Sequence, residues 1–250
     1  MKRIILTILA VGMTTLAFSQ KTFILSHQEK KGFLALSAGG SMPMGRFASC
    51  SPIDGKAGMA SDGIALSISA GYRFVGPIGL MIRGEQHRNS VQTHALIDAL
   101  YRSESDVWTA QAGQWSITTV MGGPYISLPM GRFSFDARLL AGQATAVLPS
   151  TTMAGNFGNV DMAVKTTGSQ STATALGGGL SLRYRLGRSL SVHLNTDYTR
   201  SQLMFDNLTS TAWSSNGRSE SSLYSSGRVI DVVSLSGGVT ILFGNSHRPF

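Results

Sequence analysis

The residues best suited to chemistry lie near the middle of the first half of the chain, where two histidines have hydroxyl or carboxyl groups close by. His87 is followed by Ser90, and His94 is followed by Asp98. A histidine within hydrogen-bond reach of a serine can activate it as a nucleophile, and a histidine beside a carboxylate can serve as a general base. Serine is abundant along the whole chain, so such neighbours arise by chance. The sequence therefore predicts no enzyme.

Other ligand sites are equally weak in the sequence. Five histidines are scattered and Cys50 is the single cysteine, so no metal site, cofactor or internal disulfide is expected. The run Gly177-Gly178-Gly179 lacks the Lys and Ser or Thr of a phosphate-binding loop. The net charge is +8, but the arginines are spread singly and form no basic block. Nucleic acid is therefore not expected as a partner.

Charged residues and histidines occur instead at alternate positions of strand-like segments, on one predicted face. They are Arg73, Arg83, Glu85, His87, Asp136, Arg138, Arg183, Arg185, His193 and Asp197. Successive side chains of a strand point to opposite faces, so this set would line the inside of a barrel. Side chains just fill the interior of an eight-stranded barrel, and unpaired buried charges are costly. We therefore expect a lumen charge network that fills the interior; the alternative is a narrow path for ions or small solutes. The network comprises Arg73, Arg83, Glu85, Asp136, Arg138, Arg183, Arg185 and Asp197.

The strands that would carry this network recur as hairpins. Apolar residues alternate with small or polar ones on both sides of three short turns, at Gly76-Pro77, at 128–132 and at Gly187-Arg188. Single alternating strands stand near 33–38 and 233–243. Eight strands result, and an even number lets the first and last strands pair so that no edge remains. The predicted fold is all-β, a transmembrane antiparallel up-and-down β-barrel.

Two segments complicate this prediction. Gly122-Gly123-Pro124 interrupts a strand whose alternation is uneven, and we expect a β-bulge there that changes the phase. Residues 153–167 could pair across Asn156-Phe157-Gly158-Asn159. This pairing would form either a hairpin within a loop or two further strands of a ten-stranded barrel.

The composition favours a membrane barrel. Charged residues make up 14% of the chain and glycine contributes 29 residues, yet no apolar run reaches the roughly 20 residues of a spanning helix. Aromatic residues near the short turns are expected at the membrane interface: Tyr72, Phe74, Tyr125, Phe133, Phe135, Tyr184 and Phe243. Four long polar segments lie opposite the short turns, which would place them outside the cell: 42–62, 91–113, 145–171 and 203–228.

The N-terminus has the three regions of a secretory signal peptide. Lys2 and Arg3 precede an apolar run from Ile4 to Phe18, and small residues follow at the expected cleavage site. We therefore expect residues 1–19 to be a signal peptide and 20–31 an N-terminal periplasmic segment. The barrel is expected over 32–243 and a C-terminal tail over 244–250.

With this signal, the strand GLSLRYRLG and the last strand VSLSGGVTILFG, the mature chain resembles the porin-like outer-membrane β-barrel family, of the OmpA/OmpX and opacity-protein type. The resemblance implies a location in the outer membrane, contact with its lipids and insertion by the barrel-assembly machinery. That machinery would read Phe243 as the closing aromatic residue, although this chain continues to Phe250. The expected role is structural or interactive, with a small pore, a loop-borne adhesin and an outer-membrane enzyme as alternatives.

The long segments contain or adjoin all three tryptophans, Trp108, Trp115 and Trp213. Aromatic rings among Ser, Gly and Asn are typical of an adaptable binding surface. Packing within the loops is the alternative interpretation, and for Trp115 so is an outer aromatic girdle.

Overall fold

The computed structural model describes residues 30–51, 54–98, 108–157 and 160–245. The expected signal peptide and most of the segment after it lie outside these described residues. Within them the chain is almost wholly β-structure, and one antiparallel sheet contains all eleven strands. Among the described residues no helix is long and apolar enough to cross a membrane.

Eight of the strands form a closed ring. Each of these strands pairs antiparallel with the one of the eight that follows it in the sequence. The ring closes because β11, the last strand, pairs with β1 as well as with β10. The ring strands are β1 (Lys30–Pro43), β2 (Ala60–Val75), β3 (Ile78–Val91), β5 (Trp115–Met130), β6 (Phe133–Leu148), β9 (Ser169–Arg185), β10 (Leu190–Ser214) and β11 (Ser219–Asn245). The predicted up-and-down barrel is confirmed, with eight strands in its wall.

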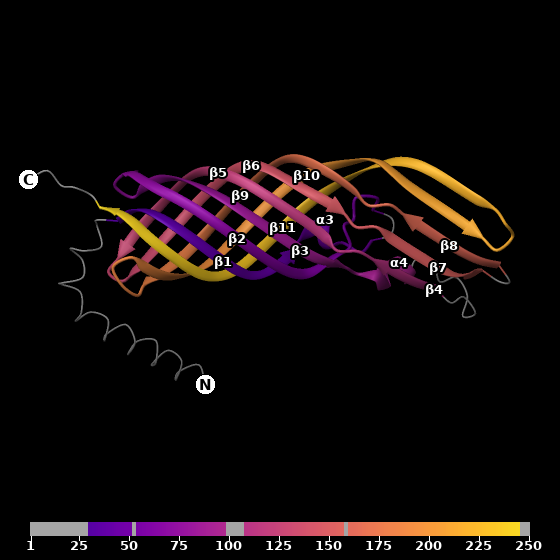
Figure 1. Cartoon of the computed structure of the whole chain (residues 1–250), viewed down its shortest axis with the longest axis horizontal. Coiled ribbons are helices and arrows are strands. Elements are labelled where there is room, and N and C mark those ends of the chain that lie inside the picture. Colours follow the sequence, from indigo (N-terminus) through magenta and orange to yellow (C-terminus); the bar gives the residue numbers. More distant parts are fainter. Residues whose placement is uncertain (1–29, 52–53, 99–107, 158–159, 246–250) are drawn as a thin grey trace, which may run out of the picture.

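The other three strands extend the sheet beyond one end of the ring (Figure 1). β8 (Val160–Thr166) pairs with the last residues of β10, β7 (Thr151–Phe157) pairs with β8, and β4 (Trp108–Ala112) pairs with β7. The pairing of β7 with β8 is the loop hairpin anticipated over 153–167. It stands outside the ring, so the ten-stranded alternative is wrong.

The barrel wall separates two kinds of side chain. Large apolar residues point outward and remain exposed, as Leu66 (53%), Ile82 (56%) and Leu194 (62%) illustrate on three different strands. Their neighbours point inward and are buried, including Ala65 and Arg83. Soluble monomers rarely expose a continuous apolar surface of this extent. The outward face has the chemistry of a surface that contacts lipid.

The expected β-bulge at Gly122-Gly123-Pro124 is absent. Gly122 pairs with Ala141 and Tyr125 with Arg138 in one unbroken register, and Pro124 pairs with Leu80 on the other side without a shift. The strand therefore keeps its phase from end to end. Its alternation looked uneven because its inward residues include large apolar side chains as well as polar ones.

The segment 203–228, expected as a long loop, is largely strand. β10 continues to Ser214 and β11 starts at Ser219, and the two pair down to Trp213 and Ser219 with one register shift between Phe205 and Leu208. Serine and threonine on both faces hide the alternation from sequence inspection. Short helices α3 (Gly45–Ala48) and α4 (Thr93–Asp98) occupy two of the other long segments. All of these lie at the end opposite the short turns (Figure 1).

Candidate functional site

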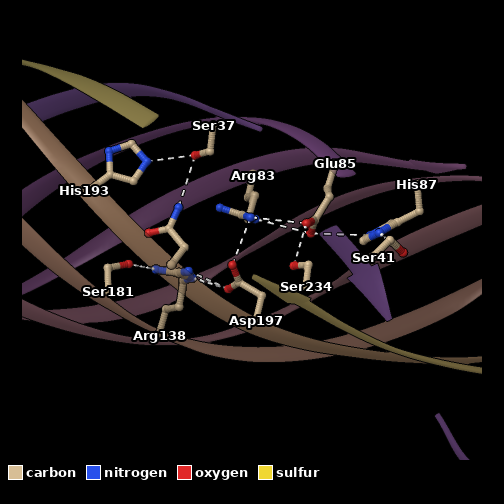
Figure 2. A network of polar contacts seen from close by, with 11 residues as sticks. Ser37, Ser41, Arg83, Glu85, His87, Arg138, Ser181, His193, Asp197 and Ser234 are labelled. Carbon is tan, nitrogen blue, oxygen red and sulfur yellow. Dashed lines mark hydrogen bonds and ion pairs between the residues drawn. The ribbon is translucent and has the colours of Figure 1, made fainter. Parts of the chain in front are cut away.

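A cluster of paired charges crosses the middle of the lumen. Asp197 on β10 lies 2.9 Å from an Arg83 amino group and 2.5 Å from one of Arg138. Arg83 also lies 3.3 Å from Glu85, two residues along the same strand. All four side chains are at least nine-tenths buried. Figure 2 shows the two guanidinium groups converging on the Asp197 carboxylate from β3 and β6, so one acid joins three parts of the wall.

Hydroxyl and imidazole groups extend this cluster in both directions. Ser234 donates to Glu85 at 3.0 Å, and Ser181 accepts a hydrogen bond from Arg138. His193 contacts the hydroxyls of Ser37 at 2.8 Å and Thr240 at 2.7 Å. Buried polar groups are costly when unpaired. These contacts therefore let the wall hold several charges inside a barrel whose outside is apolar.

A serine, a histidine and a glutamate meet within the network, which invites a catalytic interpretation. His87 Nδ1 lies 3.1 Å from Ser41 Oγ, and His87 Nε2 lies 3.7 Å from Glu85. However, Ser41 donates its proton to Asn89 Oδ1 at 3.0 Å, so His87 meets the oxygen lone pair and takes no proton from it. Ser41 is also fully buried. A substrate could not reach this serine, which fits a packing role.

The remaining predicted network residues lie nearer the short turns and form separate contacts. Arg183 pairs with Asp136 at 2.6 Å and stacks over the Phe33 ring at 4.8 Å. Arg73 donates to the Lys30 carbonyl at 2.5 Å. Arg185 donates to the carbonyls of Gly187 and Arg188 in the turn between β9 and β10, at 2.8 and 2.7 Å. The eight predicted residues thus form a central cluster, one lower ion pair and two arginines bound to backbone.

Little space remains between these groups. Two cavities in the lower and middle lumen measure about 30 and about 20 Å³. One ordered water needs roughly 10–15 Å³ measured in the same way. The smaller cavity therefore has room for one or two waters, and the larger one for two or three.

The wall makes room for the cluster with glycine. A Cβ on Gly179 would lie 2.0 Å from Asp197 Oδ1 and 2.9 Å from Arg138 Nε. On the outward side of the same strand, a Cβ on Gly178 would meet its nearest neighbour, a Leu139 methyl, at 3.4 Å. Only the surrounding side chains show that Gly179 is the position within this glycine run that makes room for the charge cluster.

Buried apolar side chains form a cluster, which we call the plug, at the outer end of the lumen. Phe47 of α3 is fully buried and packs edge-on against Trp115, with ring centroids 5.2 Å apart. Trp115 donates its indole N–H to the Gly58 carbonyl at 3.0 Å, which ties the segment after β1 into the mouth of the barrel. The rest of this cluster comes from the walls: Ala60, Ile117, Ala146, Leu148, Leu203, Phe205, Leu208, Ile230 and Val232.

Near this plug the inward face of the wall changes from polar to apolar, and the outward face changes from apolar to polar. On β10 the inward residues are polar from Ser191 to Ser201 and then apolar at Leu203, Phe205 and Leu208. The outward residues of β10 are chiefly apolar from Leu190 to Tyr198; beyond them Arg200, Gln202 and Asp206 are polar, with Met204 an exception. β5 shows the same change, since its outward residues pass from Val120 to Thr118 and Ser116. Below this level the barrel is apolar outside, and above it the barrel has the pattern of a water-soluble protein.

Six of the seven aromatics expected at the interface point outward or lie partly exposed near the short turns: Tyr72, Phe74, Phe133, Phe135, Tyr184 and Phe243. Tyr125 does not. It is 3% exposed inside the lumen, where its ring packs against Phe33, because β5 keeps its phase through Gly123. Of the tryptophans, Trp115 and Trp108 are buried, so packing accounts for them, whereas Trp213 is 43% exposed.

Metal binding has no support in the part of the chain that the structure describes. No group of three or more His, Cys, Asp or Glu residues there could hold an ion. The acids and histidines of the lumen are instead matched to arginines and hydroxyls.

No protein-family model and no curated protein matches this chain. One solved structure of similar fold is that of Neisserial surface protein A, with a TM-score of 0.42 and 12% sequence identity. The match covers 85% of this chain and 97% of that protein. Ail, the attachment invasion locus protein of Yersinia pestis, matches at TM-score 0.40 and 12% identity over 84% of this chain and 99% of its own. The outer membrane protease OmpT from Escherichia coli matches with a TM-score of 0.32 and 7% sequence identity. That match covers 87% of this chain and 98% of OmpT. These are outer-membrane β-barrel proteins, in line with the predicted resemblance. The likeness concerns fold alone, and the barrel assignment here rests on the strand pairing described above.

Proposed function

We propose that this chain is an integral outer-membrane protein with a structural or interactive role and a closed lumen. The outward apolar side chains of the ring support membrane residence, because the alternative is a wide apolar surface in water. Membrane lipids are then its constant partners. Export by the N-terminal signal and insertion by the assembly machinery belong to the same proposal.

The main support for a closed lumen is that Asp197 bridges Arg83 and Arg138. The three side chains span the interior from β3, β6 and β10 and are buried. Opening a path for ions would require breaking these pairs and leaving charges uncompensated, which costs several kcal/mol. The apolar plug around Phe47 and Trp115 adds a second obstruction nearer the outside.

The part of the barrel above the level of chemical inversion supports an interactive role. We call it the head: the outer ends of the ring strands with β4, β7, β8 and the tip of the β10–β11 hairpin (Figure 1). It offers a sheet that stands clear of the ring, and Trp213, Leu223 and Tyr224 are exposed on it. Such a surface can make contacts while the closed barrel serves as its anchor.

Single-channel recording in planar bilayers tests the closed lumen. The wild-type protein should give no reproducible open conductance. A variant with Arg83, Arg138 and Asp197 changed to serine and with Phe47 and Trp115 changed to alanine lacks both obstructions and should conduct, which would show that the preparation inserts. Heat-dependent gel mobility of both proteins would check that each is a folded barrel. Reproducible wild-type conductance would overturn the closed lumen and favour the small pore.

A further inference from the structure

The head has one long strand edge that no described residue pairs with. β1 pairs with β11 only as far as Pro43 opposite Val232, and beyond that point β11 keeps β10 as its only partner. Residues on both sides of α3 reach the base of this edge: Met44, just before the helix, donates to the Asp231 carbonyl, and Gly55, after it, accepts a hydrogen bond from Arg228. From Ser219 to Gly227 the backbone groups on the far side from β10 have no strand beside them within the described residues.

This edge lacks most of the features that usually protect exposed strands. Natural sheet edges are blunted by lysine, proline, bulges or very short length. The stretch from Ser219 to Gly227 contains no lysine and no proline and carries a single charge at Glu220. Its pairing with β10 has one register shift, between Ser226 and Tyr224, where the extra residue belongs to β10 and not to β11. Its residues through Ser225 are exposed. An unprotected edge of this kind is a ready template for an added strand.

The residues of the edge are complementary to themselves. If a second copy of the strand lies antiparallel with Tyr224 opposite Tyr224, then Glu220 of each copy lies opposite Arg228 of the other. Opposite charges placed directly across an antiparallel pair stabilise it. Arg228 uses one amino group on Gly55, and the guanidinium has further N–H donors for a carboxylate.

The direction of the two β11 strands determines in which membrane the second copy lies. Two barrels in one membrane are related by a two-fold axis along the membrane normal, so their β11 strands both run toward the periplasmic side. An antiparallel pair needs opposite directions, which a copy in a facing membrane supplies. We propose that the free edge of β11 pairs with the same edge of a second copy in an opposed membrane and so holds two outer membranes together. This inference rests on the proposed function, because it requires the ring to lie in the bilayer with the head outside.

Vesicle clustering tests the proposal with charge exchange. Full-length protein is reconstituted into lipid vesicles, and clustering is followed by light scattering. Wild-type vesicles should cluster. Vesicles with Glu220→Arg alone, or with Arg228→Glu alone, should cluster at least about tenfold more slowly, because two attractive pairs become repulsive. Mixing the two variant populations should restore clustering, since each introduced arginine then faces an introduced glutamate. Restoration also shows that both variants fold.

Disulfide trapping fixes the register and the direction. In a Cys50→Ser background, Tyr224→Cys should give a covalent dimer across the two-fold axis, whereas Glu220→Cys should not. The Tyr224→Cys dimer should form between differently labelled vesicles and be absent when each vesicle carries one copy and vesicles are kept dilute. Vesicles that carry inserted, heat-modifiable protein but do not cluster would overturn the proposal and leave the membrane barrel intact. Equal clustering of the wild type and the unmixed variants, or dimers within one vesicle, would overturn it as well. Failure to insert would instead contradict the proposed function.

Discussion

Asp197 on β10 and Arg83 on β3 lie 2.9 Å apart although their strands occupy opposite places in the ring. The contact therefore runs across the whole width of the lumen. Because Asp197 also binds Arg138 on β6, one carboxylate holds three separated strands at a fixed spacing.

Removing the bridging acid should destabilise the barrel strongly. Asp197→Ala would leave Arg83 and Arg138 buried beside one another with Glu85 as the only neighbouring acid of the cluster. Breaking a buried pair from one side costs about 3–5 kcal/mol, and urea unfolding in lipid vesicles would measure the loss. Arg200→Ala is the matched control, because its 3.6 Å contact with Asp231 is half exposed and is expected to contribute less than about 1 kcal/mol. Equal losses in the two variants would refute the special role of the bridge.

A methyl group at Gly179 should have a similar effect through geometry alone. The added Cβ would fall 2.0 Å from Asp197 Oδ1, so the carboxylate would have to leave its place between the arginines. Gly179→Ala should lower the free energy of unfolding by at least about 2 kcal/mol, as expected for overpacking that also disturbs a buried pair. Gly178→Ala, which adds the same atoms on the outward face, should change it by less than about 1 kcal/mol. A larger loss at Gly178 would mean that its neighbour Leu139 cannot adjust and that the cluster is not what limits this strand.

The plug predicts a clear contrast between two tryptophans. Trp115→Ala removes a ring that is 2% exposed together with its hydrogen bond to Gly58, and a loss of about 3–5 kcal/mol is expected. The same change should make the segment 44–60 more susceptible to protease, because that hydrogen bond ties it into the mouth of the barrel. Trp213→Ala should leave both properties nearly unchanged, since that ring is 43% exposed. Protease resistance in Trp115→Ala equal to wild type would show that other contacts hold the plug.

Alternation was enough to predict the ring, and it failed where the environment of the wall changes. Ile64 to Phe74 and Leu190 to Tyr198 face lipid on one side and the lumen on the other, so their period of two is plain in the sequence. On β5 the inward residues turn apolar at Ile117 and Trp115, so the strand looked out of phase and Tyr125 was assigned to the wrong face.

Pairings between distant strands are beyond sequence inspection for a different reason. The alternation placed Arg83, Arg138 and Asp197 on the lumen side, but which arginine meets which acid depends on the register of every strand around the ring. The outer extensions of β10 and β11 were missed because Ser and Thr residues occur on both of their faces and hide the alternation. A strand can be recognised in the sequence when its two faces require different kinds of side chain.

Spin labels on β10 test the membrane barrel most directly. In a Cys50→Ser background, Leu194→Cys and Gln202→Cys place a nitroxide on the same outward face, one below and one above the level where the wall changes chemistry. In lipid vesicles the label at position 194 should be relaxed strongly by oxygen and weakly by a water-soluble nickel complex, and the label at position 202 should show the reverse. Equal access of the nickel complex to both positions would contradict the account, because the apolar face of the ring would then lie in water.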